Sequence, residues 1–435
     1  MRFVLGNRHM LAAGGTEVHI VTVAEHLQRL GHEVLLYAPE LGPFADHARR
    51  RGLEISDSLR ELPASCDVTF SQDAIVVYDL AERYPDALSV FRICGDVADF
   101  QLPPQLTAVV DLIVVLSDRY ERIARACADR VPVLRLPVPI DVDRLVPLGA
   151  VRERPERAVM LGNYLERDAL LSDVWGGLGV EVQRIGGHVQ AYDVATAVAD
   201  ADIVVAKSRA ALDAMACGRP VYVFDVFGGD GWVTPELYPA LEADNFAGLA
   251  TGRVIDAATL AGDLSAYRPE MGPVNRDLAL QHHNARDHVL ALLSAIGEHE
   301  PQKRSPAPLR ELARLTAMQW SWELTAREFR SMHWPLREHA AASEHRSAEA
   351  AEAARQAARE RDDALAVGRQ LAAERDEAAA RARRLEAQPA DGALRDEIDR
   401  LQSQLDAMRA TRAWKLATVL WRIKRRLRRA GRPHR

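Results

Sequence analysis

The sequence predicts an α/β protein with two consecutive doubly wound domains, followed by a helical extension. Short apolar runs alternate with amphipathic stretches from the N-terminus onward. This alternation is typical of parallel strands that are covered by helices on both faces. It stops at a proline- and charge-rich segment, 138–157, and then begins again. The chain has 435 residues, more than one hydrophobic core usually holds.

Ten apolar runs predict buried strands. They are Phe3–Leu5, Val34–Tyr37, Val68–Phe70, Leu88–Phe91, Leu112–Leu116, Val133–Leu136, Ala158–Leu161, Val180–Ile185, Ile203–Val205 and Val221–Phe224. Amphipathic helices are expected at Glu17–Leu30, Asp118–Ala128 and Arg209–Cys217. Because ligands of such sheets bind beyond the carboxyl ends of the strands, we expect the site in the cleft between the two domains.

Shifts in composition set the predicted domain boundaries. The expected parts are a Rossmann-like domain over 1–137, a linker over 138–157, a second Rossmann-like domain over 158–310, a helix over 311–335, an Ala-, Glu- and Arg-rich coiled coil over 336–408 and a basic amphipathic tail over 409–435. Apolar residues from Leu394 to Met408 follow a 4, 3, 4, 3 spacing. This short a/d seam suggests self-association through 394–408 as a hypothesis.

Composition narrows the class of protein. Hydrophobic residues make up 48% and no run of eighteen apolar residues occurs, so we expect a soluble protein without a transmembrane helix or signal peptide. Four scattered cysteines predict reduced thiols in the cytoplasm. The formal charge is −6, yet eleven Lys and Arg and no Asp or Glu follow from Arg409 on. This tail, with Trp414 and Trp421, predicts peripheral binding to an anionic inner membrane face, and we expect no nucleic acid.

Two glycines near the N-terminus mark a candidate anion site. Gly14 and Gly15 follow the first strand and precede a helix, with Thr16 as its expected N-cap. Glycines let the backbone approach a ligand, and a helix N-terminus favours negative charge. A nucleotide diphosphate would suit this place, although a turn before an ordinary helix is the plainer alternative.

A second candidate lies where the third strand of the second domain ends. Ser208 is expected to cap the next helix, and Arg209 and Asp213 share one helix face. Arg209 lies at the helix end that disfavours a cation, so a bound anion would offset that cost. The alternative is a simple surface ion pair. The glycine-rich segment with Gly228 and Gly229 is expected to be a loop, with a helix beginning at Thr234 and Pro235.

Four stretches together resemble a retaining glycosyltransferase of the GT-B architecture, of the family-4-like group. They are AAGGTEVHIVTVAEHLQRLGHEVLLYAP, RLPVPIDVDRLVP, RAALDAMACGRPVYVFD and AMQWSWELTAREF, and they fall within about residues 1–332. The last stretch resembles the family's terminal helix, which crosses back to the first domain.

The resemblance implies transfer of a sugar from a nucleotide-diphosphate donor to a glycan or lipid-linked acceptor, with retention and without a metal or cofactor. Surface polysaccharide or glycolipid synthesis would be the setting. In the family's front-face reaction the protein mainly positions groups and stabilises diphosphate charge. Gly14 and Gly15 match the diphosphate loop, and Asp213 matches the acidic residue that binds the donor ribose.

The sequence also departs from the family pattern. Val205 stands where the family has its first acidic residue, and Asn163 and Arg167 fall at the positions of its diphosphate clamp. The fourth strand ends without the family's histidine, which leaves Asp96, Arg92 and His9 as catalytic candidates. Among other polar residues, we expect His282 and His283 on a helix surface, and Trp320 and Trp322 in packing.

Two other functions stay open at this point. One is a sugar-nucleotide epimerase on the same fold. The other is a non-catalytic scaffold with a degenerate transferase body that presents the coiled coil.

Overall fold

The computed structural model describes residues 1–95, 99–162, 168–186, 191–225, 228–302 and 309–341. The chain divides into two compact units, Met1–Met332 and His333–Arg435. The first unit holds two large sheets with their helices and one small two-stranded sheet, and the α/β class with two doubly wound sheets is confirmed. The predicted coiled coil and basic tail, which include 394–408 and 409–435, lie outside the described residues.

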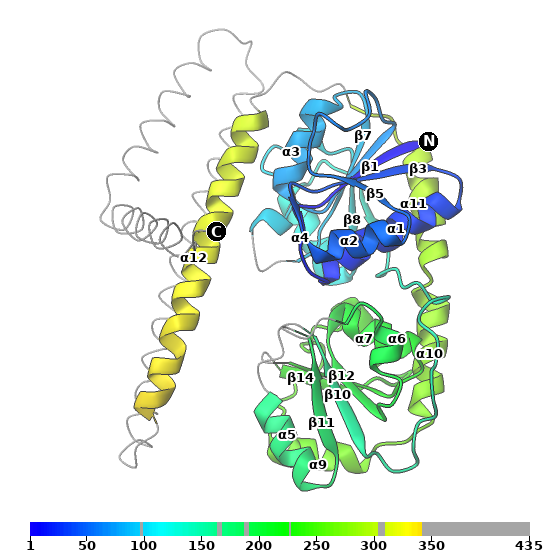
Figure 1. The fold of residues 1–435 in the computed structure, drawn as a ribbon, viewed down its shortest axis with the longest axis vertical. Helices are drawn as coiled ribbons and strands as arrows, with labels where there is room; N and C mark the ends of the chain where they lie inside the picture. The colour runs from blue at the N-terminus through cyan, green and yellow to red at the C-terminus, as the bar shows by residue number, and fades with distance from the viewer. Residues whose placement is uncertain (96–98, 163–167, 187–190, 226–227, 303–308, 342–435) are drawn as a thin grey trace, which may run out of the picture. The chain divides into compact units, whose positions relative to one another are not determined.

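The first sheet has seven parallel strands in the order β5-β3-β1-β6-β7-β8-β9. Their bounds are β1 (Arg2–Gly6), β3 (Glu33–Tyr37), β5 (Glu54–Ser56), β6 (Val68–Ser71), β7 (Leu88–Arg92), β8 (Leu112–Val115) and β9 (Val133–Arg135). The connecting helices are α1 (Gly15–Arg29), α2 (Pro43–Arg50), α3 (Ala74–Arg83) and α4 (Asp118–Cys127), and β2 (His9–Met10) pairs with β4 (Glu40–Leu41). Strand order reverses beside β1, which pairs with β3 on one side and β6 on the other. Figure 1 labels β1 and β3 in this sheet.

The second sheet has five strands in the order β11-β10-β12-β13-β14. Their bounds are β10 (Arg157–Leu161), β11 (Glu181–Ile185), β12 (Ile203–Ala206), β13 (Val221–Asp225) and β14 (Gly228–Trp232). Its helices are α5 (Asp168–Gly177), α6 (Val194–Ala197), α7 (Ser208–Ala216), α8 (Tyr238–Ala243), α9 (Ala257–Ser265) and α10 (Met271–His282). Strand order reverses between β10 and β12, and β14 alone runs antiparallel.

All ten predicted strands are present, and each end lies within one residue of its predicted position. Parallel strands that are buried on both faces give continuous apolar runs, and this is why the sequence revealed them. The segment around Gly228 and Gly229 is a strand, not the predicted loop. A Cβ at Gly229 would lie 2.9 Å from Cγ1 of Ile255 and 3.0 Å from the Val223 carbonyl oxygen, so close packing explains this glycine. The next helix, α8, begins at Tyr238 rather than at Thr234 or Pro235.

The chain returns to the first sheet earlier than the expected boundary at residue 310. Helix α11 (Ala285–Gly297) buries Val289, Leu292 and Ile296 in a core cluster with residues of the first sheet and α1. Asn284 starts this helix, because its side chain accepts a hydrogen bond from the Arg286 amide.

The connection between the two sheets is buried at its first residues, unlike an ordinary linker. Ile140 is fully buried, its amide donates to the His283 carbonyl oxygen at 2.7 Å, and its carbonyl accepts from the Ala285 amide at 2.9 Å. The outgoing and returning segments therefore cross between the sheets as a hydrogen-bonded pair. His283 is buried here, not on a helix surface as predicted, and its ring bonds the Tyr238 hydroxyl and the Val138 carbonyl.

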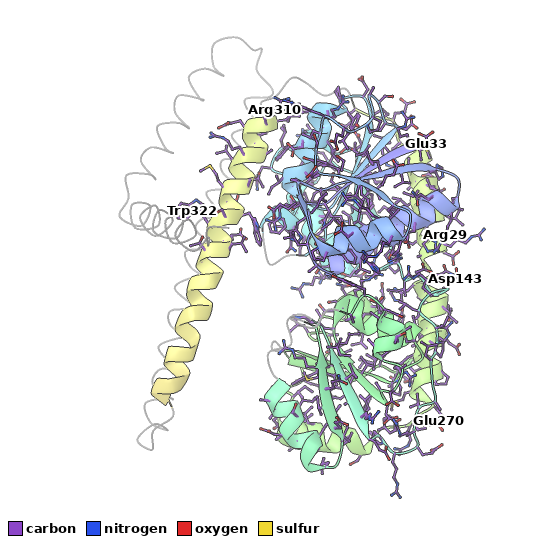
Figure 2. The ribbon with its side chains drawn as sticks, viewed as in Figure 1. Arg29, Glu33, Asp143, Glu270, Arg310 and Trp322 are labelled. Carbon is purple, nitrogen blue, oxygen red and sulfur yellow. The ribbon has the colours of Figure 1, made fainter. Side chains whose placement is uncertain are left out.

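Helix α12 (Leu309–Ala341) begins in the first unit and ends in the second. Leu309 and Ala313 are buried in a core cluster of the first unit. Arg310, labelled in Figure 2 at the beginning of α12, forms an ion pair with Glu82 of α3 at 2.6 Å. The first turns of α12, the predicted crossing helix, thus pack against α3 and the core of the first unit.

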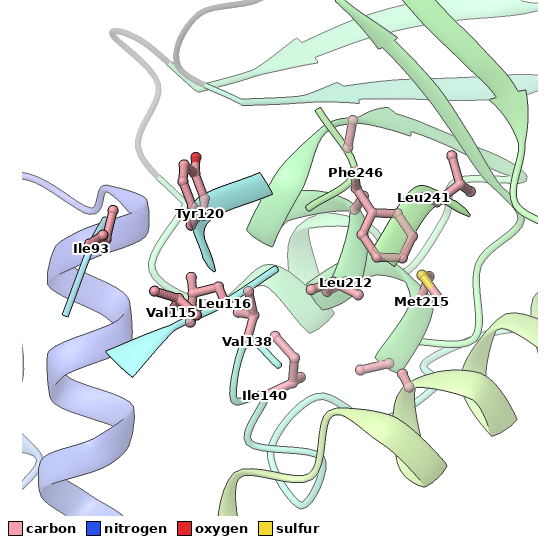
Figure 3. Packing of buried hydrophobic residues seen from close by; sticks show 14 of the residues in the cluster. Ile93, Val115, Leu116, Tyr120, Val138, Ile140, Leu212, Met215, Leu241 and Phe246 are labelled. Carbon is pink, nitrogen blue, oxygen red and sulfur yellow. The ribbon is translucent and has the colours of Figure 1, made fainter. Parts of the chain in front are cut away.

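One hydrophobic cluster joins the two sheets. Figure 3 shows Val115 and Leu116, at the end of β8, in the same cluster as Leu212 and Met215 of α7. Ile140 of the crossing segment also belongs to it. Burial of a side chain of this size contributes about 1.5–3 kcal/mol, so this shared core fastens the carboxyl ends of β8 and β12 within one unit.

Candidate functional site

The candidate site is a cluster of polar side chains. It lies beyond the carboxyl ends of the strands, at the point in each sheet where the strand order reverses. In the first sheet, α1 follows β1 and its loop. In the second sheet, α7 follows β12 directly. Such switch points leave a crevice above the strand ends, where open α/β sheets bind their ligands. Two helix N-termini, at residues 15 and 208, thus mark the two sides of the cluster.

The start of α1 is organised by an acidic side chain. Gly14 is the N-cap, not Thr16 as predicted, and no side chain caps the helix there. The buried carboxylate of Glu17 accepts hydrogen bonds from Asn7 Nδ2 at 3.3 Å and from Thr16 Oγ1 at 2.9 Å, and it pairs with His9 Nδ1 at 3.1 Å. Its oxygen would collide with a Cβ at residue 14. The glycine therefore leaves room for Glu17, and its role in diphosphate binding stays a prediction.

Gly15 differs from Gly14 in its surroundings. It is exposed, and a Cβ there would meet no atom within 4 Å. Its backbone amide belongs to the first turn of α1, where amides lack helical acceptors. The space in front of this turn is open at Gly15, as an approaching anion would require.

The start of α7 has an unusual backbone. Lys207 is the N-cap, and Ser208, the predicted cap, is the first helical residue with φ of 47°. The Ser208 amide donates to the Phe246 carbonyl at 2.8 Å, and Asn245 and Phe246 also have positive φ. Non-glycine residues in this region cost free energy and cluster at functional sites.

The guanidinium of Arg209 connects the two sides of the site. It donates to the Thr22 hydroxyl of α1 at 3.2 Å and to the Pro139 carbonyl oxygen at 3.1 Å. Its Nε lies 3.6 Å from Asp213 Oδ2, which confirms the predicted shared helix face. Burial lowers the pKa of Arg209 and raises that of Asp213, and each charge opposes the shift of the other. The pair is buried, so the simple surface ion pair is wrong.

Three further cationic or basic side chains lie around this pair. Arg92 ends β7, is buried, and donates from Nη1 to Gln72 Oε1. Burial lowers its pKa to about 10, so it stays protonated at neutral pH. His19 of α1 and His288 of α11 stand edge to face with ring centroids 5.8 Å apart. Burial and then the charge of Arg92 lower the pKa of His19, so the imidazole is neutral.

The tautomer of His288 follows from its surroundings. Its Nδ1 bonds the Pro137 carbonyl oxygen at 2.8 Å, so the proton of the neutral ring resides on Nδ1. Burial lowers its pKa to about 3. Nε2 is therefore an acceptor that faces the buried cluster.

Several buried polar atoms of this cluster have no hydrogen-bond partner among the residues that the structure describes. They are both ring nitrogens of His19, Nε2 of His288, Nε of Arg92, Nε of Arg209 and Oδ1 of Asp213. An unsatisfied buried donor or acceptor costs about 1–3 kcal/mol. A polar ligand that bonds these atoms would recover part of that cost.

A second group of side chains lies at the loop after β1. Arg8 Nε is 3.6 Å from Asp73 Oδ2, and its guanidinium lies over the rings of Phe100 and Trp320, 4.9 and 4.4 Å from their centroids. Burial raises the pKa of Asp73 to about 6, although Asp73 caps α3 by accepting from the Ile75 amide. Trp320 thus packs against protein side chains, as predicted.

Sequence reasoning found part of this site and missed part. It named Arg92, His9, Arg209 and Asp213, which the structure places around the strand ends. It missed His19, His288, Asp73 and Arg8, because nothing in the local sequence shows that they meet. Asn163, Arg167 and Asp96 lie outside the described residues. Val205, at the family's acidic position, packs in the second sheet's core with Met160 and Tyr222.

The described residues show neither a metal-binding cluster nor a membrane-spanning helix. No group of three or more His, Cys, Asp and Glu side chains there could hold a metal ion. No helix among them is both long and apolar enough to span a bilayer. All four cysteines are free thiols.

Comparison with known proteins gives similarity of fold only. No family model matches the chain, and no curated protein sequence matches it. The crystal structure of Anabaena Alr3699/HepE in complex with UDP and glucose matches 68% of this chain and 100% of its own, with 11% identity and a TM-score of 0.49. An α-glucosyltransferase in complex with UDP and DNA matches 68% and 99%, with 12% identity and a TM-score of 0.48. Acinetobacter baumannii MurG matches 68% and 100%, with 14% identity and a TM-score of 0.41.

Proposed function

We propose that this protein transfers a sugar from a nucleoside-diphosphate donor to a glycan or lipid-linked acceptor. One observation carries the proposal. Helices α1 and α7 both start at the switch points of their sheets, and Arg209 of α7 bonds Thr22 of α1. Arg209 Nε and Asp213 Oδ1 are buried and have no hydrogen-bond partner among the described residues. Positive charge beside two helix N-termini suits a diphosphate, and a buried carboxylate suits ribose hydroxyls.

In this proposal, each polar side chain of the cluster contacts one part of the donor. Asp213 accepts hydrogen bonds from the ribose through Oδ1, while Arg209 fixes its orientation and adds positive charge. Arg92 stays cationic in a buried place and stabilises negative charge on the leaving diphosphate. The amides of Gly14 and Gly15 face the phosphates, as does the first turn of α7 after Ser208, where the Ser208 hydroxyl is the proposed contact because its amide bonds the Phe246 carbonyl. Asn163, Arg167, Gly228 and Gly229 remain predicted donor contacts.

The chemistry that we propose is retention at the anomeric carbon without a metal ion. The donor's own diphosphate takes the acceptor proton, so the protein needs no base of its own at the reacting carbon. His9, which pairs with Glu17, and Asp96 are the side chains that we propose beside the transferred sugar. Product analysis by NMR decides the stereochemistry, since an inverted anomeric configuration would rule out this mechanism.

The central test is nucleotide binding by isothermal titration. UDP, the nucleotide in two of the three similar structures named above, is the first ligand, followed by GDP and ADP. The Asp213→Asn variant keeps the side-chain size and should weaken the nucleoside diphosphate about tenfold, because it loses a charged acceptor for ribose. Asp143→Asn is the matched control, since Asp143 is exposed in the connecting segment.

The outcomes separate the functions considered. Binding followed by donor hydrolysis or transfer supports a transferase. Interconversion of one nucleotide sugar into another supports an epimerase instead. If no nucleoside diphosphate binds the full chain, a non-catalytic scaffold is the better explanation and the proposal fails.

We also propose that 409–435 holds the protein at an anionic membrane surface, where a lipid-linked acceptor would lie. The support is the sequence: eleven basic and no acidic residues from Arg409, with two tryptophans. Liposome sedimentation of the full chain and of a variant without 409–435 tests it. Equal binding of both proteins to vesicles with anionic lipid would contradict it.

A further inference from the structure

A small cavity lies at the C-terminal end of α1, whereas the candidate donor site lies toward its N-terminal end. Its volume is about 310 Å³, and its lining residues are Glu25, Gln28, Arg29, Arg51 and Arg144. Glu25, Gln28 and Arg29 belong to the last turns of α1. Arg51 follows α2, and Arg144 belongs to the segment that connects the sheets. At 1.5 Å per residue along α1, Gln28 is about 13 Å from His19. Thr22, which the Arg209 guanidinium contacts, is about 9 Å from Gln28 by the same rise. None of the five lining residues belongs to the candidate donor site.

Three arginines line this cavity, and two of them form ion pairs with carboxylates. Arg51 pairs with the buried carboxylate of Glu25, and its Nε is buried without a partner in the described chain. Arg29 donates to Asp141 Oδ2 at 3.0 Å and to His26 Nε2 at 2.9 Å. Arg144 is exposed, and its side chain makes no hydrogen bond or ion pair with any described residue. In Figure 2 Arg29 and Asp143, the neighbour of Arg144, mark this edge of the molecule.

The Arg144 guanidinium has no carboxylate at ion-pair distance among the described residues, although its charge, after the hydrogen bonds from Thr196, helps to lower the pKa of the Asp193 carboxyl. Glu25 and Asp141 neutralise two of the three arginines, through the pairs described above. The pKa of the half-buried His47 is lowered first by burial, then by the charge of Arg51 and then by the charge of Arg144. The positive charge of Arg144 is therefore felt by its neighbours. An anion in the cavity would meet Arg144 directly and the unpaired Nε of Arg51.

We propose that this cavity binds a phosphorylated small molecule of the size of a sugar phosphate. Guanidinium groups match phosphate oxygens with two parallel hydrogen bonds and keep their charge at any physiological pH. The volume lies at the lower end of the range for small-molecule sites, which fits one sugar ring and one phosphate. The bound phosphate ties α1, the end of α2 and the connecting segment together. This proposal does not depend on the proposed transferase activity.

The test uses the full chain at fixed ionic strength and isothermal titration with glucose 6-phosphate, inorganic phosphate and glucose. Wild-type protein should bind glucose 6-phosphate and, more weakly, phosphate, but not glucose. Arg144→Ala should weaken glucose 6-phosphate about tenfold, since it removes a charged hydrogen-bond donor. Arg154→Ala is the matched control, because Arg154 is an exposed arginine that does not line the cavity. It should bind as wild type does.

Two further measurements make the result specific to this cavity. UDP affinity should be the same in wild type and Arg144→Ala, which keeps the outcome distinct from that of the donor-site test. Arg144→Lys keeps the charge and should recover part of the glucose 6-phosphate affinity. No binding of either phosphate compound by wild type, or equal binding by wild type and Arg144→Ala, would overturn the proposal.

Discussion

Arg209 Nε lies 3.6 Å from Asp213 Oδ2, one helical turn away, and the two side chains are only 10% and 9% exposed. A buried ion pair gains from the mutual attraction of its charges but costs desolvation, so its net contribution is small. Removing one partner leaves the other charge buried and unpaired, which is far more costly. This asymmetry decides how variants of the pair should behave.

We predict that Asp213→Ala lowers the free energy of unfolding by about 3–5 kcal/mol, because Arg209 remains buried without its counter-charge. The double variant Arg209→Met, Asp213→Leu should recover most of this loss. Urea unfolding of the single variants Arg209→Met and Asp213→Leu and of the double variant, combined as a thermodynamic cycle, gives the coupling energy. A coupling near zero would mean that the two side chains act independently.

The raised pKa of Asp73 predicts a stability that falls as pH rises. Its pKa is about 6 in the folded protein and lower in the unfolded chain, so the folded state binds more protons between about pH 4 and 6. The stability contribution is complete below pH 4 and is lost as pH rises through 6, with a size of about 3 kcal/mol. Asp73→Asn should remove this slope, since asparagine also caps a helix. The check is the difference in unfolding free energy between wild type and variant at several pH values.

Asp202 should behave in the opposite way. Burial alone would raise its pKa, but hydrogen bonds from the amides of Glu156, Arg152 and Arg157 outweigh burial and lower it. Its stabilisation is therefore present above the unfolded pKa, near 4, and disappears as pH falls through the lower folded value. Asp202→Asn should reduce stability at pH 7 and flatten the acid limb of the pH profile. An unchanged acid limb would contradict the prediction.

Trp320 should hold the first turns of α12 against the loop after β1. Trp320→Ala removes the ring that lies 4.4 Å from the Arg8 guanidinium. A contact of this kind contributes about 1–2 kcal/mol, so amides in 309–320 should exchange about 5- to 30-fold faster with deuterium. Leu324→Ala is the control, because Leu324 is 40% exposed on the same helix. Equal exchange in the two variants would mean that Trp320 does not dock α12.

The sequence was most informative where burial is uniform. Val204 and Val221, for example, sit in neighbouring parallel strands, and such strands appear as apolar runs whatever their partners are. It failed at β14, because glycines that permit close packing on Ile255 look the same as glycines of a flexible loop. It also failed at Ser208, whose φ of 47° depends on the contact with Phe246 and not on the residue's own capping preference.

In the candidate site, too, local relationships were predictable from the sequence and long-range contacts were not. The Arg209–Asp213 pair was predictable because a spacing of four residues places both on one helix face. The meeting of His19 with His288 was not, because it depends on α11 returning to α1. Long-range contacts of this kind follow from topology, which a single sequence does not encode in any local pattern.

The paired crossing at Ile140 and Asn284 has a consequence for how the chain is organised as modules. The second sheet occupies sequence between the two crossing segments, so it is an insertion within a discontinuous first domain. Its entry and exit points are neighbours, joined by backbone hydrogen bonds of 2.7 and 2.9 Å. Domains whose ends lie close together tolerate transplantation. Residues 143–281 could therefore be exchanged as one cassette, with both splice points on a single pair of adjacent segments.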